Sequence, residues 1–276
     1  MKQQKIIIFT LLFMVFVLCL YSYSNRLYEG YQIQRSALCL LTVNPHDIYV
    51  KFLNHFDKYD VYILIDNNSV NIDEYIKKYP KIQFIQIQDE EAIQNGYWDS
   101  SYIIPKKTIS WDKALYYFSK KNTSYNYVWF IEEDVYIPNE ESIQNIDHKY
   151  PNADLLCSDY NMNPDGYLDN WSHWEQAKLY FELPWAKGLQ CICRLSKRLL
   201  EKIKHFVDTH KKLTFIETLF TTLVIKNNYL HITLHEFNEI DCCKTHNETE
   251  IDPTKFYHPI KNIETHQMLR DKLRLR

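Results

Sequence analysis

Short apolar runs and mixed polar segments alternate along the first half of the chain. Apolar runs of strand length occupy residues 37–43, 60–66 and 82–87. Residues 45–56 and 72–80 lie between these runs and carry the mixed pattern that is typical of short helices. Strands that alternate with helices predict a parallel sheet covered by helices on both faces. In such α/β sheets, ligands bind just past the carboxyl ends of the strands.

The first half closes with one more helix and one more strand. Residues 108–121 predict an amphipathic helix whose apolar face is formed by Trp111, Ala114, Leu115 and Phe118. Residues 127–131 are an uninterrupted apolar run and predict a fourth strand. In the less regular second half, we expect a strand that is followed by a helix from about Ser196. A helix within 214–228, a strand at 231–237 and a basic helix after Pro259 come next.

Three consecutive carboxylates, Glu132, Glu133 and Asp134, follow the fourth apolar run directly. In an extended strand, Glu132 and Asp134 point to one side and Glu133 points to the other. Adjacent carboxylates repel one another unless water or a cation compensates their charge. Hard divalent ions take carboxylate oxygens, and Mg²⁺ or Mn²⁺ usually completes its shell with substrate phosphates. The triplet therefore predicts either a cation site or a solvated turn.

The first residues carry a membrane signal. Lys2 and Lys5 precede an uncharged apolar run, residues 6–21, which has the length and flank of a membrane anchor or of a signal peptide. Small residues at Ser22 and Ser24 would suit cleavage in the second case. Both interpretations place the rest of the chain in the lumen of the secretory pathway. We therefore expect a tail and signal-anchor at 1–24, a short stem at 25–35 and a folded domain at 36–276.

Composition and cysteine content narrow the function classes. The 276 residues are 46% hydrophobic, with a net charge of −3, so the basic surface that nucleic-acid binding needs is not expected. Only 4 glycines are present, and neither Gly-rich phosphate-binding motif occurs. A lumenal location permits disulfides, which we favour over a zinc site for the segment 241–246. The candidate cysteines, whose pairing the sequence does not fix, are Cys39, Cys157, Cys191, Cys193, Cys242 and Cys243.

The membrane signal, the alternating first half and the acidic triplet together resemble the GT-A glycosyltransferases. These are Rossmann-like enzymes that transfer a sugar from a nucleotide-sugar donor, and the triplet stands where they carry a D-x-D motif, with Glu in place of the first Asp. The resemblance covers residues 36–262 in pattern. It implies a nucleotide-sugar-binding half at 36–138 and an acceptor-binding half at 139–276. The segments "WAKGLQCICRLS" and "FIETLF" resemble a branch found in algae, protists and large DNA viruses.

The resemblance also implies roles for residues of the donor half and the tail. Asp134 would bind Mn²⁺ or Mg²⁺ directly, and Glu132 would contact the ion through water or contact the ribose. His258 would return to the metal, although a structural role for this histidine stays open, and Lys261 would meet the diphosphate. Asp66 would contact base or ribose, or would only cap a turn. The remaining donor-binding candidates are Thr42, Val43, Lys113 and Glu133.

Transfer to a hydroxyl acceptor requires a general base in inverting enzymes. Glu217 stands among apolar residues, and desolvation there would raise the pKa of its carboxyl, which suits a base. Glu175 and Asp169 are rival candidates, and a solvent-facing position for Glu217 is the alternative. Three tryptophans are candidates for stacking on acceptor sugar rings, or for the core: Trp171, Trp174 and Trp185.

The sequence thus predicts a divalent-metal-dependent, single-pass type II membrane glycosyltransferase of the ER or Golgi. Its donor would be a UDP-sugar, and its acceptor a hydroxyl on a glycan or glycoprotein. A sugar-binding protein that has lost catalysis is the main alternative. A metal-dependent phosphodiesterase or nuclease would need more Asp and His ligands than the sequence gathers. A purely structural membrane glycoprotein would not need the alternating α/β pattern.

Overall fold

The computed structural model describes residues 35–101, 107–167, 169–247 and 249–275. All described helices and strands belong to one compact unit, Ser36–Arg276. The predicted tail and membrane segment at 1–24 and nearly all of the predicted stem lie outside the described residues. Within the described ranges, no helix is both long enough and apolar enough to cross a membrane.

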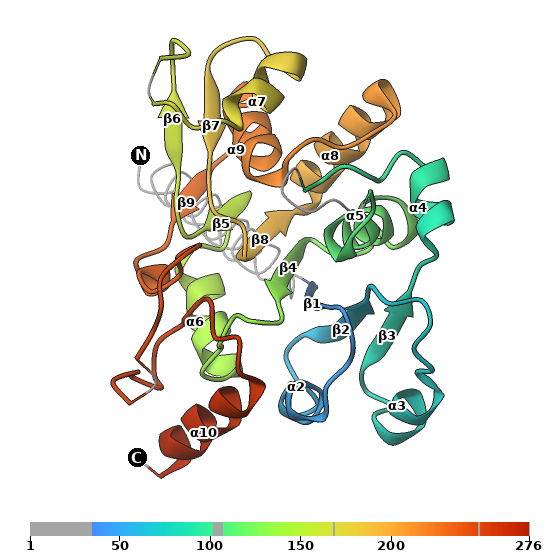
Figure 1. Ribbon diagram of the computed structural model, residues 1–276, viewed down its shortest axis with the longest axis vertical. Helices are drawn as coiled ribbons and strands as arrows, with labels where there is room; N and C mark the ends of the chain where they lie inside the picture. Colours follow the sequence, from blue (N-terminus) through green and yellow to red (C-terminus); the bar gives the residue numbers. More distant parts are fainter. Residues whose placement is uncertain (1–34, 102–106, 168, 248, 276) are drawn as a thin grey trace, which may run out of the picture. The chain divides into compact units, whose positions relative to one another are not determined.

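A seven-stranded sheet forms the centre of this unit, with the strand order β3-β2-β1-β4-β8-β5-β9 (Figure 1). The strands from β3 to β4 are parallel, β8 runs antiparallel to both of its neighbours, and β5 is parallel to β9. The predicted α/β class with a mostly parallel sheet is confirmed. The strands are β1 (Ser36–Thr42), β2 (Asp60–Ile65), β3 (Gln83–Gln86), β4 (Tyr127–Glu132), β5 (Leu155–Cys157), β8 (Ile192–Ser196) and β9 (His231–Thr233).

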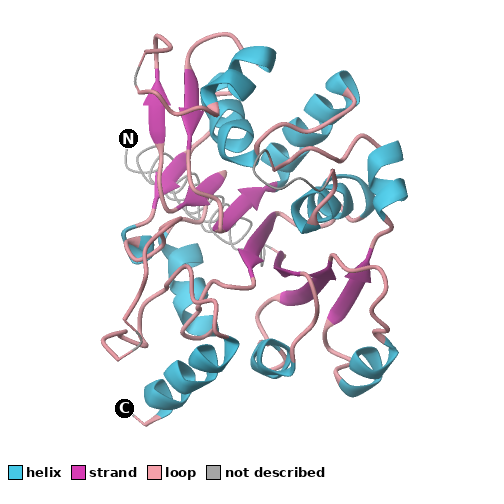
Figure 2. Cartoon of the chain, viewed as in Figure 1, coloured by secondary structure: helices cyan, strands magenta, loops and turns pink. Residues whose placement is uncertain are grey.

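Helices cover both faces of the sheet, and a separate two-stranded ribbon stands beside it (Figure 2). The ribbon pairs β6 (Asn161–Asn163) with β7 (Trp185–Lys187). The helices are α2 (Asp47–Leu53), α3 (Asp73–Lys78), α4 (Asp89–Gln94), α5 (Ser110–Tyr116), α6 (Glu140–Lys149), α7 (Trp174–Tyr180), α8 (Lys197–His210), α9 (Ile216–Lys226) and α10 (Ile263–Arg274). Two short turns complete the set, a π-helical η1 (Tyr117–Lys121) and a 3₁₀ η2 (His235–Phe237).

The central strands are buried on both faces, which explains their continuous apolar runs. Along β1, Cys39 packs into the core beneath α5, α8 and α9, and its neighbours Leu38 and Leu40 pack into the core beneath α2 and α6. All three side chains are at most 3% exposed. The alternation of side chains across a strand therefore builds two cores from one apolar run.

Two predicted elements differ in extent from the sequence pattern. The helix predicted over 108–121 begins at Ser110 and continues from Tyr117 as a π-helical turn. The strand predicted at 231–237 stops at Thr233, because β9 is an edge strand that pairs only with the three residues of β5. The residues that follow it form η2, where Phe237 turns back into the core.

A buried ion pair ties the antiparallel strand β8 to the end of α6. Arg194 is 1% exposed, and its guanidinium donates to the Asp147 carboxylate and to the carbonyl oxygens of Tyr150 and Ala153. Arg194 also stands opposite Trp129 of β4, the strand that carries the acidic triplet. The position of β4 therefore depends on this buried cation.

We expect Arg194→Met to lower the free energy of unfolding by about 3–5 kcal/mol, because it leaves the Asp147 carboxylate without its cation and removes the guanidinium hydrogen bonds to two carbonyl oxygens. Lys204→Met is the matched control, since it removes only the exposed pair with Asp208 and should cost less than about 0.5 kcal/mol. Urea unfolding of the three proteins measures both differences. Equal losses in the two variants would contradict the prediction.

Candidate functional site

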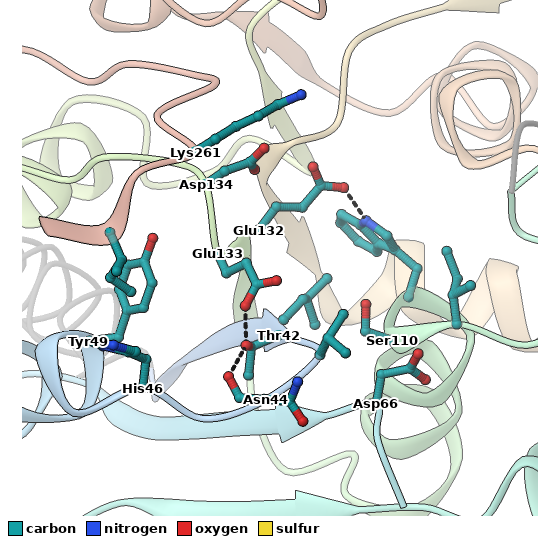
Figure 3. A pocket seen from close by; sticks show the side chains of 15 residues that line it. Thr42, Asn44, His46, Tyr49, Asp66, Ser110, Glu132, Glu133, Asp134 and Lys261 are labelled. Atoms are coloured by element: carbon teal, nitrogen blue, oxygen red, sulfur yellow. Dashed lines mark hydrogen bonds between the residues drawn. The ribbon is translucent and has the colours of Figure 1, made fainter. Parts of the chain in front are cut away.

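A cavity of about 770 Å³ opens at the carboxyl ends of β1, β2 and β4 (Figure 3). The strand order reverses between β1 and β4, so the cavity lies at the switch point where doubly wound sheets bind ligands. Its volume falls within the range of sites for small molecules and cofactors. Its lining includes the predicted residues Thr42, Val43, Asp66, Glu132, Glu133, Asp134 and Lys261, together with Trp111.

The three carboxylates of the triplet face this cavity in different directions. The strand β4 ends at Glu132, so Glu133 and Asp134 lie in the following turn. Glu132 accepts a hydrogen bond from the indole Nε1 of Trp111 at 2.7 Å, and Glu133 accepts one from the hydroxyl of Thr42. Burial raises the pKa of Glu132 and of Glu133, and these two donors work against the shift. Trp111 therefore has a polar function in addition to its place in the core.

His258 lies beside Asp134 and Glu132. Its Nε2 lies 3.3 Å from Asp134 Oδ1 and 3.8 Å from Glu132 Oε2. Its Nδ1 lies 2.6 Å from the carbonyl oxygen of Asp241, which can only accept, so Nδ1 carries a proton and Nε2 faces the carboxylates. Burial lowers the pKa of His258, but Asp134 and Glu132 outweigh it and raise the pKa overall. Burial likewise opposes ionisation of Asp134, yet His258 holds its pKa below the usual value.

These groups fit a divalent cation. Carboxylate oxygens from Asp134 and Glu132 and an imidazole nitrogen from His258 are ligands that Mn²⁺ accepts. A thiol joins them, because Glu132, Cys191 and His258 each place one ligand atom within 4.8 Å of the other two. Sequence reasoning missed Cys191 as a member of the site. Its position depends on the antiparallel direction of β8, where the Glu132 N–H donates to the Cys191 carbonyl at 2.9 Å, and no sequence motif signals that pairing.

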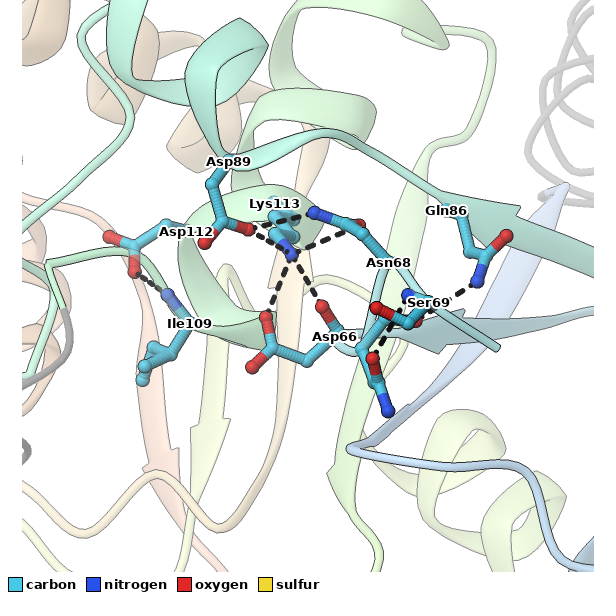
Figure 4. A network of polar contacts seen from close by, with 9 residues as sticks. Asp66, Asn68, Ser69, Gln86, Asp89, Ile109, Asp112 and Lys113 are labelled. Carbon is cyan, nitrogen blue, oxygen red and sulfur yellow. Dashed lines mark hydrogen bonds and ion pairs between the residues drawn. The ribbon is translucent and has the colours of Figure 1, made fainter. Parts of the chain in front are cut away.

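Lys113 does not line the cavity, which differs from the predicted orientation toward the nucleotide. It is 0% exposed, and its Nζ lies 2.9 Å from Asp66 Oδ1 and 2.7 Å from Asp89 Oδ1 (Figure 4). It also donates to the main-chain oxygen of Asp66 at 2.7 Å. A buried ammonium requires such partners. Lys113 therefore fixes Asp66, and Asp66 in turn lines the cavity.

Glu217 lines a second cavity, of about 320 Å³, together with Trp171 and Lys187. The start of α9 is held there by the N–H of Gly188, which donates to the Glu217 carbonyl at 3.0 Å. A Cβ at Gly188 would lie 2.5 Å from the carbonyl oxygen of Asp159, so only glycine fits this approach. Burial, with repulsion from Glu132 and Asp159, raises the pKa of Glu217 to about 7.

The two rival base candidates lie in unsuitable surroundings. Asp169 pairs with Lys187 and accepts from the indole of Trp174, and these contacts lower its pKa to about 2. Glu175 is on the solvent side of α7, where its side chain is 75% exposed and lies 3.8 Å from Lys178. Neither carboxylate lines either cavity. Glu217, by contrast, lines a cavity, and the charge of Glu132 contributes to its raised pKa.

The predicted acceptor tryptophans separate into one cavity residue and two core residues. Trp171 lines the second cavity, with the ammonium of Lys187 4.9 Å from the centre of its ring. Trp174 and Trp185 are 5% and 8% exposed and pack with Ala177 in a small core of their own. Their expected stacking on an acceptor sugar is therefore corrected to a packing role, because no face of either ring is open.

The cysteines of the described residues carry free thiols, so the disulfides that we favoured are not formed. Cys39, Cys157 and Cys193 are buried in the core. Cys242 and Cys243 are exposed, with their sulfur atoms 3.1 Å apart. Burial and the neighbouring carboxylates of Glu132, Asp134 and Glu217 raise the pKa of the sixth thiol, Cys191, well above its usual value.

Comparison with known proteins found no matching family model and no matching curated protein. Among solved structures, mouse xyloside xylosyltransferase 1 is similar over 81% of this chain and 97% of its own, with 12% identity and a TM-score of 0.39. An active-site mutant of LgtC is similar over 86% and 95%, with 10% identity and a TM-score of 0.48. A 4-diphosphocytidyl-2C-methyl-D-erythritol synthase from Anaerococcus prevotii covers 75% and 95%, with 9% identity and a TM-score of 0.40. At these identities and scores, similarity assigns neither family nor activity to this chain.

The raised pKa of Glu217 has a consequence for stability. A folded-state pKa of about 7 against an ordinary 4.5 means that folding favours the protonated acid, and this contribution is lost as pH rises through 7. Between about pH 5 and pH 8, we expect the free energy of unfolding of the wild type to fall on the order of 2–3 kcal/mol relative to that of Glu217→Gln, because glutamine cannot ionise. Urea unfolding of both proteins at the two pH values measures the change. A difference that does not vary with pH would contradict it.

Proposed function

We propose that this chain is a GT-A-type glycosyltransferase that moves a sugar from a nucleotide-diphosphate donor, a UDP-sugar, to a hydroxyl acceptor on a glycan or glycoprotein. The observation that carries the proposal is the gathering of Glu132, Asp134 and His258 at the switch point of the sheet. Glu132 and Asp134 line a cavity of nucleotide size, and His258 lies beside both carboxylates. Glu217, a partly buried acid with a pKa raised to about 7, is close enough to Glu132 to be affected by its charge.

The donor half of the cavity offers groups for each part of the nucleotide. Thr42, the last residue of β1, and Val43 after it border the space for the base, and Asp66 follows β2, where base or ribose would lie. Glu133 is held against Thr42 and limits that space. Lys261 is exposed on the segment before α10 and lines the cavity close enough to Asp134 to act on its charge. A cation there suits the diphosphate.

Asp134, Glu132 and His258 are the residues that would hold Mn²⁺ or Mg²⁺. When bound, the ion would stabilise negative charge on the leaving diphosphate. Glu132 and Asp134 supply carboxylate oxygens, and the Asp241 carbonyl orients the ring of His258. The Trp111 indole holds one oxygen of Glu132, which leaves the other oxygen toward His258.

Glu217 is the proposed general base. In an inverting transfer, the acceptor oxygen bonds to the anomeric carbon while the bond from that carbon to the diphosphate oxygen breaks. The acceptor proton passes to the Glu217 carboxylate, whose pKa of about 7 is close to the operating pH expected of a base. Trp171 borders the same cavity and offers a ring for an acceptor sugar.

The cellular setting is part of the proposal. A basic flank and an apolar run at the start of the sequence support a single-pass type II anchor, with the catalytic unit in the ER or Golgi lumen. Cleavage of that segment would give a secreted protein instead.

Asp134→Ala should remove metal affinity and donor affinity together, because the ion and the diphosphate bind as one unit. We expect wild-type chain to melt at a higher temperature with Mn²⁺ and one UDP-sugar, and Asp134→Ala to show no such shift. Thermal melting against a panel of nucleotide sugars, with Mn²⁺ or with EDTA, measures this. Asp271→Ala, an exposed acid on α10, is the control and should behave as wild type. No shift of the wild type with any donor would contradict the donor site.

Glu217→Gln should keep the donor-dependent melting shift and lower turnover by about 10²–10⁴-fold, the loss that follows removal of a general base. Glu175→Gln is the matched control and should change neither quantity, since its side chain is in solvent. Transfer of a radiolabelled sugar to an acceptor mixture measures the rate. Normal turnover in Glu217→Gln would place the base elsewhere. Donor binding by the wild type without any turnover would favour the sugar-binding alternative.

A further inference from the structure

Cys191 is a buried thiol that the proposed transfer reaction does not use. It lies just before β8, is 8% exposed and has its sulfur beside Glu132 and His258. Thiol sulfur is a poor ligand for Mg²⁺, which prefers oxygen, whereas Zn²⁺ binds thiolate, imidazole and carboxylate together. The side chains around Glu132 therefore offer two overlapping sets of ligands with different chemical preferences.

The geometry favours a metal on the sulfur side. Glu132, Cys191 and His258 each contribute one ligand atom, and all three atoms lie within 4.8 Å of one another. A tetrahedral shell with bonds of about 2.0–2.3 Å places its ligand atoms roughly 3.5 Å apart. His258 Nε2 and Glu132 Oε2 already lie at 3.8 Å.

Outer contacts hold two of these ligands in the required orientation. The Asp241 carbonyl accepts from Nδ1 of His258, so the lone pair of a neutral ring is on Nε2, toward the site. The indole of Trp111 donates to Oε1 of Glu132, which leaves Oε2 for an ion. Such supporting hydrogen bonds are typical of zinc sites and distinguish this group from a chance cluster of polar side chains.

We propose that Cys191, Glu132 and His258 form a binding site for a thiophilic divalent cation of the Zn²⁺ class. Binding replaces the thiol proton: the S–H bond breaks, a sulfur–metal bond forms, and the proton passes to solvent without any change of oxidation state. Three protein ligands leave a fourth position for water or for a neighbouring carboxylate.

The zinc site shares Glu132 and His258 with the cation site of the proposed function. The competition between the two ions described next rests on that proposal. Two ions cannot share Glu132 and His258 at the same time, so a bound Zn²⁺ excludes Mn²⁺ or Mg²⁺ and with them the nucleotide diphosphate. The thiol thus makes the transferase sensitive to zinc, and zinc in the compartment would regulate donor binding.

Co²⁺ is the probe, because a cobalt–thiolate bond gives an intense near-ultraviolet charge-transfer absorption that oxygen and nitrogen ligands do not give. We expect titration of the full chain with Co²⁺ to produce this band and Zn²⁺ to abolish it. Cys191→Ser should lose the band. A double variant, Cys242→Ser with Cys243→Ser, is the control, since it removes the exposed thiol pair and should keep the band.

A second variant guards against a folding defect in Cys191→Ser. Glu132→Gln leaves the sulfur in place and should weaken Co²⁺ binding by at least about tenfold, within the range for loss of a ligand or its support. Circular dichroism checks that each variant is folded. Absence of the band in the wild type, its persistence in folded Cys191→Ser, or its loss in the double variant would each overturn the proposal.

The cobalt spectrum does not depend on turnover, so the two proposals fail separately. A sulfur band without a donor-dependent melting shift would support the thiolate site and contradict the proposed transferase function. A donor-dependent melting shift without a sulfur band would support the proposed transferase function and contradict the thiolate site. If both hold, Zn²⁺ should suppress the Mn²⁺-dependent melting shift of the wild type, and Cys191→Ser should need at least about tenfold more Zn²⁺ for the same effect.

Discussion

Repulsion among Glu132, Glu133 and Asp134 is the constraint around which the site is arranged. Each carboxylate is partly buried, and each has a donor of its own: the Trp111 indole, the Thr42 hydroxyl and the His258 ring. These donors come from α5, from β1 and from the segment before α10. The acidic turn at the end of β4 therefore holds together parts of the chain that are far apart in sequence, and the cavity forms where they meet.

Two buried cations, Lys113 and Arg194, are compensated in a similar way by carboxylates. Lys113 pairs with Asp66 and Asp89 beneath the cavity, and Arg194 of β8 pairs with Asp147. A buried charge without a partner costs more free energy than a lost surface pair. The carboxylates and the buried cations must therefore be placed together when the chain folds.

Two carboxylates of the second half show how different surroundings give chemically similar groups different pKa values. Asp169 has Lys187 and an indole N–H beside it, and its pKa is lowered to about 2. Glu217 is partly buried and has two acids nearby, Glu132 and Asp159, and its pKa is raised to about 7. Both stood in the sequence as candidates for the general base. Only the local field, which depends on distances across the fold, distinguishes an acid that stays ionised from one that exchanges protons near neutrality.

The sequence by itself determined the strands of the first half, its helices other than α4, the class of the fold and the place of the acidic triplet. Those features follow from local patterns, since an apolar run of strand length and an amphipathic helix depend on neighbours along the chain. Tertiary structure decided that Lys113 faces Asp66, that Trp174 and Trp185 are in a core, and that Cys191 joins the acids. Each of these depends on the direction of a strand or on a contact between distant segments. Periodicity carries no information about such contacts, because burial and charge pairing are settled only when the segments pack.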